Sequence, residues 1–350
     1  HIYYGSVLHM LHNRFRITFF AACFTCCLAA FFLSACGAVN ASAPTDAASP
    51  EPAPVPTPAP TAYITLDAGA ALEWPCGIPF SEPGFTAYGA DGADISARVA
   101  CMGEVDCMTP GDYCVSYSVC DDGGSSAAAE RCVSVVPVTL PETAAEENVI
   151  YLTFDDGPCR YTEELLDVLD KYGAQATFFV IAGNNAYLDL LPRIYEAGHS
   201  IGVHACCHDY DRLYSSAASY LDDLVAARQT VYELTGEYVD LCRFPGGSTT
   251  AFHKLNNRKK GAWEVVTAQL ERMGMRYFDW NVSPENSVNS GEASVNAVIN
   301  FAPRYEVPVS LQHDTRLYSV RCVERILKWG TEHGYTFKGL DTAVPPVQNY

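Results

Sequence analysis

Basic residues are scarce in this sequence of 350 residues. Lysine and arginine total 22, aspartate and glutamate total 41, and the formal net charge is −19. Such a chain repels nucleic-acid phosphates unless it carries a basic patch. Its one basic cluster, residues 258–260, is interpreted as a solvated helix start, so we expect no nucleic-acid partner.

Structural zinc modules are not predicted either. The chain has 15 cysteines, but no two C-x-x-C units stand at the spacing of a structural zinc site. Six cysteines fall in the stretch from Cys76 to Cys132, where an oxidising compartment would allow disulfides. The sequence does not fix how those six would pair.

An apolar run near the N-terminus covers residues 17–33, which is fewer residues than a membrane-spanning helix usually has. Arg14 and Arg16 precede it, which is the pattern of a secretory signal. The letters LSACG at its end resemble a bacterial lipobox, which implies that Cys36 is lipidated. We predict a signal peptide with a lipobox over residues 1–36; an uncleaved anchor or an ordinary signal are the alternatives.

Two segments without catalytic residues follow. Residues 37–61 are rich in Pro, Ala and Thr, a composition typical of an extended linker. Residues 62–138 show short alternating patterns between turn signals, which predicts a small all-β sandwich module. The run PGDYCVSYSVCDDGG resembles bacterial immunoglobulin-like repeats, which implies a spacer or a wall-contact role.

An α/β domain is predicted over residues 145–345. Apolar runs of strand length alternate with helical patterns, which indicates a parallel sheet that is closed or nearly closed. Residues 149–154 are almost continuously apolar, as in a strand buried on both faces. Leu165, Leu166 and Leu169 lie on one side of a predicted helix over residues 162–172.

Polar side chains follow several of the predicted strands. Asp155 and Asp156 end the first strand, and His204 ends the third, with His208 four residues on. Chemistry in such folds gathers at the carboxyl ends of the strands. Two histidines and one carboxylate leave room for water on a divalent ion, which is the arrangement of a hydrolytic metal centre. A second carboxylate could then accept a proton, and a further histidine could protonate a leaving nitrogen.

Five motifs in order carry a family resemblance: TFDDG, HACCH, RFPGG, DWNVS and LQHD. Together they resemble the polysaccharide deacetylase family, also called the NodB-homology or carbohydrate esterase family 4 group. The resemblance implies a distorted (β/α) barrel of about seven parallel strands. It also implies one divalent metal, with zinc as the first choice and cobalt or manganese as alternatives.

The same resemblance implies roles for individual residues, by motif position. They are Asp155 as general base; Asp156, His204 and His208 as metal ligands; His313 as general acid; Arg243 as the residue that orients Asp155; Trp280 and Leu311 as walls of the acetyl pocket; and an amide near Gly246 as the oxyanion donor.

Several positions depart from the family pattern. Ala205 stands where a serine or threonine usually braces the loop, Gly246 where a tyrosine is usual, and Arg276 where many members have an acid. Cys206 and Cys207 lie between the ligand histidines and are interpreted as inert fillers, the alternative being thiolates that compete for the metal.

Some neighbouring residues are weighed separately. Asp279 is adjacent to Trp280 and is left out of the catalytic set. Tyr187, Tyr214 and Trp263 are aromatic residues that could flank a sugar groove.

The functional expectation is metal-dependent N-deacetylation of peptidoglycan amino sugars, with release of acetate. The enzyme would be a hydrolase acting on non-peptide carbon–nitrogen bonds. We expect a monomer, lipid-anchored to the cell membrane, extracytoplasmic and facing the cell-wall glycan. The alternatives are an inactive glycan-binding wall lipoprotein, for which Ala205 and Arg276 speak, and an O-deacetylase of acetylated polysaccharide.

Overall fold

The computed structural model describes residues 60–283 and 290–350. The predicted signal peptide over residues 1–36, including Cys36, lies outside the described residues, and so does nearly all of the linker predicted for 37–61. Within the described part of the chain, no helix combines the length and the apolar composition needed to cross a bilayer.

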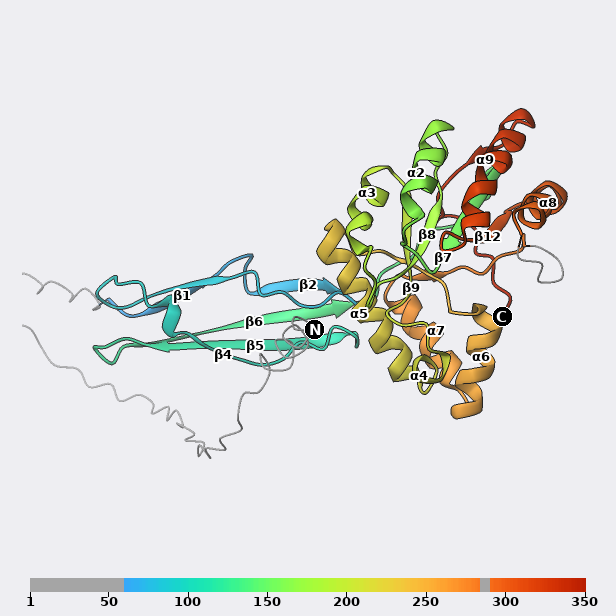
Figure 1. The fold of residues 1–350 in the computed structure, drawn as a ribbon. Helices are drawn as coiled ribbons and strands as arrows, with labels where there is room; N and C mark the ends of the chain where they lie inside the picture. The colour runs from blue at the N-terminus through green and yellow to red at the C-terminus, as the bar shows by residue number, and fades with distance from the viewer. Residues whose placement is uncertain (1–59, 284–289) are drawn as a thin grey trace, which may run out of the picture. The chain divides into compact units, whose positions relative to one another are not determined.

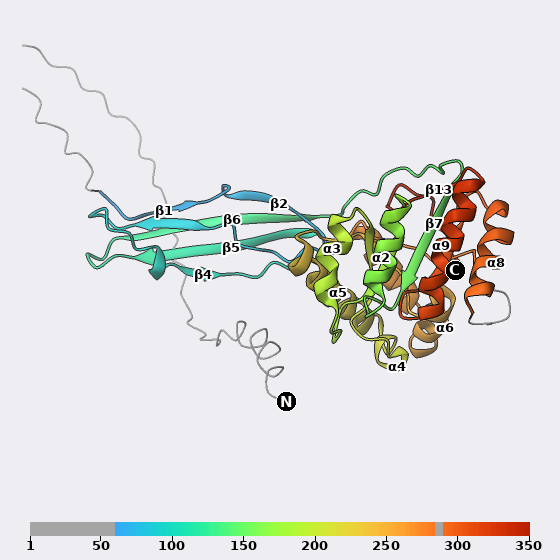
Figure 2. The same cartoon turned by 45° about the horizontal axis from the view of Figure 1, so that its top comes forward.

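Short strands make up the first described segment. β1 (Tyr63–Leu66) pairs antiparallel with β3 (Phe85–Tyr88), and the turn η1 (Ser96–Arg98) follows. A second sheet has the order β2-β6-β5-β4 and consists of β2 (Ala71–Pro75), β6 (Ser126–Val136), β5 (Gly111–Cys120) and β4 (Ala100–Met102). β5 and β6 form the long antiparallel pair in Figure 2, whereas β2 runs parallel to β6.

Alternation along β5 gives this module its core. Val115, Tyr117 and Val119 are buried, and the residues between them face outward. Val119 packs with Ala87 of β3 and with Ile95 between the two sheets. The prediction of an all-β module ahead of the α/β domain is confirmed.

The α/β domain contains a seven-stranded sheet with the order β11-β10-β9-β8-β7-β12, in which β13 also pairs with β7. Its strands are β7 (Val149–Asp155), β8 (Thr177–Ile181), β9 (Ser200–Ala205), β10 (Leu241–Cys242), β11 (Arg276–Tyr277), β12 (Val309–His313) and β13 (Thr336–Phe337). All neighbours pair in parallel, so their carboxyl ends share one edge.

The sheet curls toward closure. The Val282 amide donates to the Val309 carbonyl at 3.0 Å, and the Leu311 amide donates to the Val282 carbonyl at 2.9 Å. The segment after β11 therefore joins β12, which lies at the opposite end of the strand order. The predicted barrel of about seven parallel strands is confirmed in this curled form.

Helices surround the strands, as Figure 1 shows. They are α2 (Thr162–Lys171), η2 (Leu188–Leu190), α3 (Leu191–Glu196), α4 (Tyr210–Leu213), α5 (Ala217–Thr235), α6 (Gly247–Arg258), α7 (Ala262–Arg272), α8 (Gly291–Phe301), η4 (Ala302–Arg304) and α9 (Leu317–Glu332). Ser216 caps the start of α5 by accepting the Ser219 amide with its side chain, and Gly236 caps its end with a positive φ of 80°.

β7 is the central strand of the core. All seven of its residues are buried, because β8 and β12 pair with it along both edges and helices cover the sheet. Ile150, Leu152 and Phe154 belong to the large core with the buried leucines of α2. The prediction that residues 149–154 form a strand buried on both faces is therefore confirmed.

The sequence patterns at residues 239–244 and 276–282 predict strands, but the strands in the structure, β10 and β11, have two residues each. The run 239–244 pairs only through Leu241 and Cys242, because Pro245 has no N–H to donate and Gly246 and Gly247 have φ values of 77° and 81°. The run 276–282 pairs with β10 only at Arg276 and Tyr277; beyond them, Asp279 donates its amide to the Val347 carbonyl at 2.7 Å instead.

The basic cluster at residues 258–260 is exposed to solvent, as predicted, but it does not itself start a helix. A helix that the sequence did not indicate, α6, ends at Arg258, and the next two lysines precede Gly261, which caps α7. Positive side chains are stabilised at this end because the carbonyl end of a helix carries partial negative charge. The sequence does not indicate the start of α6, because Gly246 and Gly247 stand there and glycine disfavours a helix.

Candidate active site

The polar residues of the motifs meet at the carboxyl edge of the sheet. In the register of β12 against β7, His313 is opposite Asp155 and Leu311 is opposite Thr153. Directly opposite residues project to the same face of a sheet. His313, Leu311 and Asp155 are therefore placed together by strand pairing, although residues 155 and 313 are far apart in the chain.

Asp156 occupies a strained position beside two histidines. Its φ is 72°, which is uncommon for a residue with a side chain. Its Oδ1 atom lies 3.6 Å from Nε2 of His204 and 3.6 Å from Nε2 of His208. That oxygen is buried and has no hydrogen-bond partner in residues 60–283 and 290–350. A buried carboxylate oxygen without a donor is costly unless a cation completes it.

His204 is fixed in the form that suits a ligand. Its Nδ1 is 2.7 Å from the Arg243 carbonyl, which can only accept, so Nδ1 carries the hydrogen and Nε2 keeps its lone pair toward Asp156. Burial lowers the pKa of His204 and keeps the ring neutral. One ligand atom from each of Asp156, His204 and His208 lies within 4.8 Å of the others. This donor set fits a divalent metal ion.

Arg243 connects the strand ends through four hydrogen bonds. Its Nη1 donates to Asp155 Oδ1 at 2.8 Å and to Thr153 Oγ1 at 2.5 Å. Its Nε and Nη2 donate to the carbonyls of Phe278 and Asp279, both at 2.8 Å. Arg243 and Asp155 are both buried and form an ion pair. Because Arg243 is itself held by several acceptors, the pair fixes the Asp155 carboxylate beside Asp156.

His313 completes the cluster on the solvent side. Its Nε2 lies 3.8 Å from Asp156 Oδ2, and 36% of its side chain is exposed. It is thus in reach of a solvent-borne substrate, while His204 is not.

The three predicted pocket residues occupy different elements around this cluster. The Trp280 ring lies 5.7 Å from Cζ of Arg243. Leu311 is half-buried in β12, two residues before His313. Gly246 caps the start of α6 with its left-handed backbone. The structure brings these residues to the same edge of the sheet.

The departure at Ala205 has a compensating contact that sequence reasoning missed. The carboxylate of Asp223, on α5, accepts the Cys206 amide at 2.7 Å, directly inside the segment between the two histidines. The Cys206 thiol donates to the Asp223 carbonyl at 3.4 Å. Burial, followed by the charge of Asp223, raises the pKa of Cys206 to about 12, so this thiol is not a thiolate at neutral pH. This supports the interpretation of Cys206 as a filler.

Asp279 serves the start of α6. Its Oδ1 accepts the Ser248 amide at 2.8 Å, and its Oδ2 accepts the Ser248 hydroxyl and the Asn349 amide. Its carbonyl also holds Arg243. Arg276, at the start of β11, donates to the Pro141 carbonyl at 3.2 Å. Neither side chain makes a hydrogen bond to His313 in the structure.

Asp314 is a buried carboxyl that the sequence did not single out. Its Oδ2 accepts the Thr162 hydroxyl at 2.5 Å, and its Oδ1 has no hydrogen-bond partner in the part of the chain that the structure describes. Burial raises its pKa to about 7. A Cβ on Gly157 would lie 2.1 Å from Asp314 Oδ2, so only glycine fits next to Asp156 at this point. A short side chain packed against a loop backbone leaves no periodic signal in the sequence.

The other aromatic predictions have mixed outcomes. Tyr214 and Trp263 belong to the core, with 1% and 6% exposure, so they cannot flank a groove. Tyr187 is exposed.

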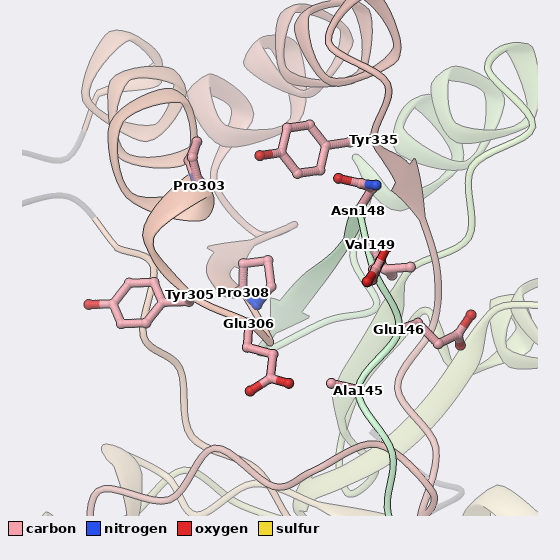
Figure 3. A pocket seen from close by; sticks show the side chains of 10 residues that line it. Ala145, Glu146, Asn148, Val149, Pro303, Tyr305, Glu306, Pro308 and Tyr335 are labelled. Atoms are coloured by element: carbon pink, nitrogen blue, oxygen red, sulfur yellow. The ribbon is translucent and has the colours of Figure 1, made fainter.

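A cavity of about 270 Å³ lies elsewhere in the domain, and Figure 3 shows its lining. Asn148 and Val149, at the start of β7, line it together with Tyr305 and Pro308, which precede β12. It therefore sits at the amino ends of the strands and includes none of the motif residues. Active sites of barrel folds lie at the carboxyl ends of the strands, which is the opposite end of the sheet.

Residues 142–263 match the family model described as polysaccharide deacetylase, and residues 64–135 match that of a bacterial surface protein Ig-like domain. The chain is 33% identical to a peptidoglycan-N-acetylglucosamine deacetylase of Bacillus cereus over 196 residues, which are 55% of this chain and 69% of the relative. A second Bacillus cereus protein with the same name is 31% identical over 88% of its length and 56% of this chain.

Solved structures agree with this. The domain is similar to the catalytic domain of a peptidoglycan N-acetylglucosamine deacetylase from Eubacterium rectale, with a TM-score of 0.55 and 34% identity over 61% of this chain and 96% of that one. It is also similar to a polysaccharide deacetylase from Bacillus cereus, with a TM-score of 0.50 and 30% identity over 58% of this chain and 97% of that one.

Proposed function

The chain belongs to the polysaccharide deacetylase family, and from this premise we propose that it removes N-acetyl groups from peptidoglycan amino sugars and releases acetate. As a member it is a hydrolase that acts on carbon–nitrogen bonds. The peptidoglycan substrate is suggested by the relatives, which include two peptidoglycan-N-acetylglucosamine deacetylases.

One observation carries the proposal. Among the described residues, the buried Oδ1 of Asp156 has no hydrogen-bond partner, and it lies 3.6 Å from two imidazole nitrogens, beside a second carboxylate held by Arg243. We assign Asp156, His204 and His208 as the residues that hold a divalent ion. Mixed nitrogen and oxygen donors favour zinc, with cobalt or manganese as alternatives. When bound, such an ion polarises a carbonyl and lowers the pKa of water.

The chain's own residues then divide the proton transfers. Asp155 accepts the proton of the attacking water, because Arg243 keeps its carboxylate in place next to the ion site. His313 donates a proton to the departing amine nitrogen, since it is partly exposed and, unlike His208, is not assigned to the ion. The products balance as a free amine and acetate.

Substrate contacts complete the assignment. Trp280 and Leu311 enclose the acetyl methyl group. The Gly247 amide already donates to the Phe244 carbonyl at 2.7 Å, so the Gly246 amide is assigned to the developing oxyanion.

The location of the enzyme is proposed from the sequence. An export signal over residues 1–36, a lipid on Cys36 and a linker over 37–61 would hold a monomeric enzyme outside the membrane, facing the wall. The Ig-like module over 62–138 would act as a spacer for the catalytic domain at 145–345.

Acetate release from purified peptidoglycan tests the activity. We expect acetate with the metal-loaded protein, none after chelation, and recovery when zinc is returned. Mass analysis of the muropeptides should show loss of acetyl groups from sugar nitrogens. Metal-loaded protein that releases no acetate from any N-acetylated glycan would contradict the proposal and favour a glycan-binding protein; acetate released from O-acetyl esters alone would indicate an O-deacetylase.

A further inference from the structure

Tyr210 fills the space left by a missing side chain at Gly246. A Cβ built on Gly246 would lie 2.8 Å from the Tyr210 hydroxyl oxygen and 3.1 Å from Cζ of the same ring. The family resemblance places a tyrosine at this motif position, where this chain has none. An aromatic ring is therefore present at the same point but comes from a different element, the start of α4.

The surroundings hold the Tyr210 ring in place. Its centroid is 5.0 Å from the His208 ring and 6.0 Å from the buried Tyr214 ring. Lys254 belongs to α6, and its Nζ lies 5.6 Å from the centroid of the Tyr210 ring. The Asp209 side chain caps α4 by accepting the amides of the two residues that follow Tyr210. Tyr210 is half-buried, so part of a fixed ring remains open beside a proposed metal ligand.

We propose that Tyr210 is a sugar-binding platform, which takes a pyranose ring of an N-acetylated glycan next to the acetyl group to be removed. The assignment rests on the proposed function. A tyrosine offers an apolar face to the C–H face of a sugar and a hydroxyl to its polar groups, at little cost in side-chain freedom. Tyr210 contacts the sugar and takes no part in the proton transfers.

Three variants test this: Tyr210→Ala, Tyr210→Phe, and Tyr195→Ala as a control at an exposed tyrosine on α3. The substrates are an N-acetylglucosamine oligomer and 4-nitrophenyl acetate, which has no sugar. We expect Tyr210→Ala to lower kcat/KM on the oligomer about tenfold, mostly through KM, and to leave the ester rate and metal content unchanged. Tyr210→Phe should keep most of the activity, and Tyr195→Ala all of it.

Binding of the oligomer, measured by calorimetry on the same variants, separates the two proposals. If the wild-type protein binds glycan without releasing acetate, the proposed function fails, and about tenfold weaker binding by Tyr210→Ala still supports the platform. Wild-type affinity and wild-type KM in Tyr210→Ala would overturn the platform. No glycan binding by the wild-type protein would also overturn it.

An independent observation concerns two cysteines of the β module. Cys114 on β5 is directly opposite Cys132 on β6. The Cys132 amide donates to the Ala70 carbonyl at 2.8 Å, so it points away from β5 and the two cysteines form a non-hydrogen-bonded pair. Cα atoms in such pairs are about 4.5 Å apart, inside the range that a disulfide requires. Both side chains are exposed.

We infer that Cys114 and Cys132 form a cross-strand disulfide in the presence of a small-molecule disulfide such as oxidised glutathione. The two thiols give up two protons and two electrons in forming the S–S bond, and the glutathione disulfide is reduced to two thiols. Cys120 is the natural control, since it is exposed on the same strand and stands opposite Ser126.

Peptide mapping after oxidation and alkylation tests the pair. We expect a peptide that links residue 114 to residue 132 in the wild-type protein and in Cys120→Ser. Cys114→Ser and Cys132→Ser should each lose it, with the other cysteine becoming free to alkylate. Failure to detect the linked peptide in the oxidised wild-type protein, or its replacement by a link from Cys132 to another cysteine, would overturn the inference.

Discussion

Replacing Asp223 with alanine should weaken metal binding although Asp223 is not a proposed ligand. Its carboxylate accepts the Cys206 amide at 2.7 Å and so fixes the backbone between His204 and His208. No hydroxyl at residue 205 is available to do this, because the residue is Ala205. Without the carboxylate, the segment loses the hydrogen bond of the Cys206 amide and keeps the weaker bond from the Cys206 thiol to the residue 223 carbonyl and the bond from the Ala182 amide to the Ala205 carbonyl.

The size of the effect follows from the bond that is lost. A hydrogen bond to a charged group contributes about 1.5–3 kcal/mol. At about 1.4 kcal/mol for each factor of ten, that is at least tenfold in affinity if the metal-binding geometry depends fully on it. Partners of metal ligands typically change affinity by about 10- to 100-fold when removed, so we expect the Kd for zinc to rise within that range.

Competition with a chromophoric chelator measures the zinc Kd directly. Asp222→Ala is the matched control, because this carboxylate is adjacent on α5 but exposed. Asp223→Asn should lie between Asp223→Ala and the wild type, since it retains an oxygen without the charge. Adding Ala205→Ser to Asp223→Ala should recover part of the affinity. A zinc Kd for Asp223→Ala within about twofold of that for Asp222→Ala would refute the reasoning, since an effective brace should change it about 10- to 100-fold.

Three further predictions concern the site itself. Asp155→Asn should lower acetate release by about 10²- to 10⁴-fold while zinc content, by elemental analysis, stays at the wild-type level; loss of zinc would show that residue 155 is a ligand. His204→Ala should lose zinc and activity together, and unchanged zinc occupancy would disprove its assignment. Burial raises the pKa of Asp314 to about 7, above its value in the unfolded chain, so the folded protein holds the extra proton and loses stability as the pH rises from about 4 to 7. Asp314→Asn should flatten that slope, by up to about 4 kcal/mol, in denaturant titrations of the chelator-treated protein, and an unchanged slope would exclude Asp314 as its source.

The sequence alone was enough to predict the sheet and the residues that gather at its edge. Continuous apolar residues at 149–154 and helical periodicity at 162–172 indicated buried parallel strands with covering helices. Parallel strands place all their carboxyl ends on one side, so Asp156, His204 and His313 could be expected together without knowledge of any contact. Their meeting depends on strand direction and register, which local patterns encode.

What the tertiary structure decided are the contacts between elements that no local pattern relates. Asp223 reaches the histidine segment from the first half of α5, and Tyr210 occupies the space next to Gly246 from the start of α4. α6 starts at two glycines because Asp279, on a different segment, accepts the Ser248 amide and hydroxyl. Periodicity reports which face of an element is buried, but the partner across the gap is selected by how the packed elements fit, and that fit exists only once the chain has folded.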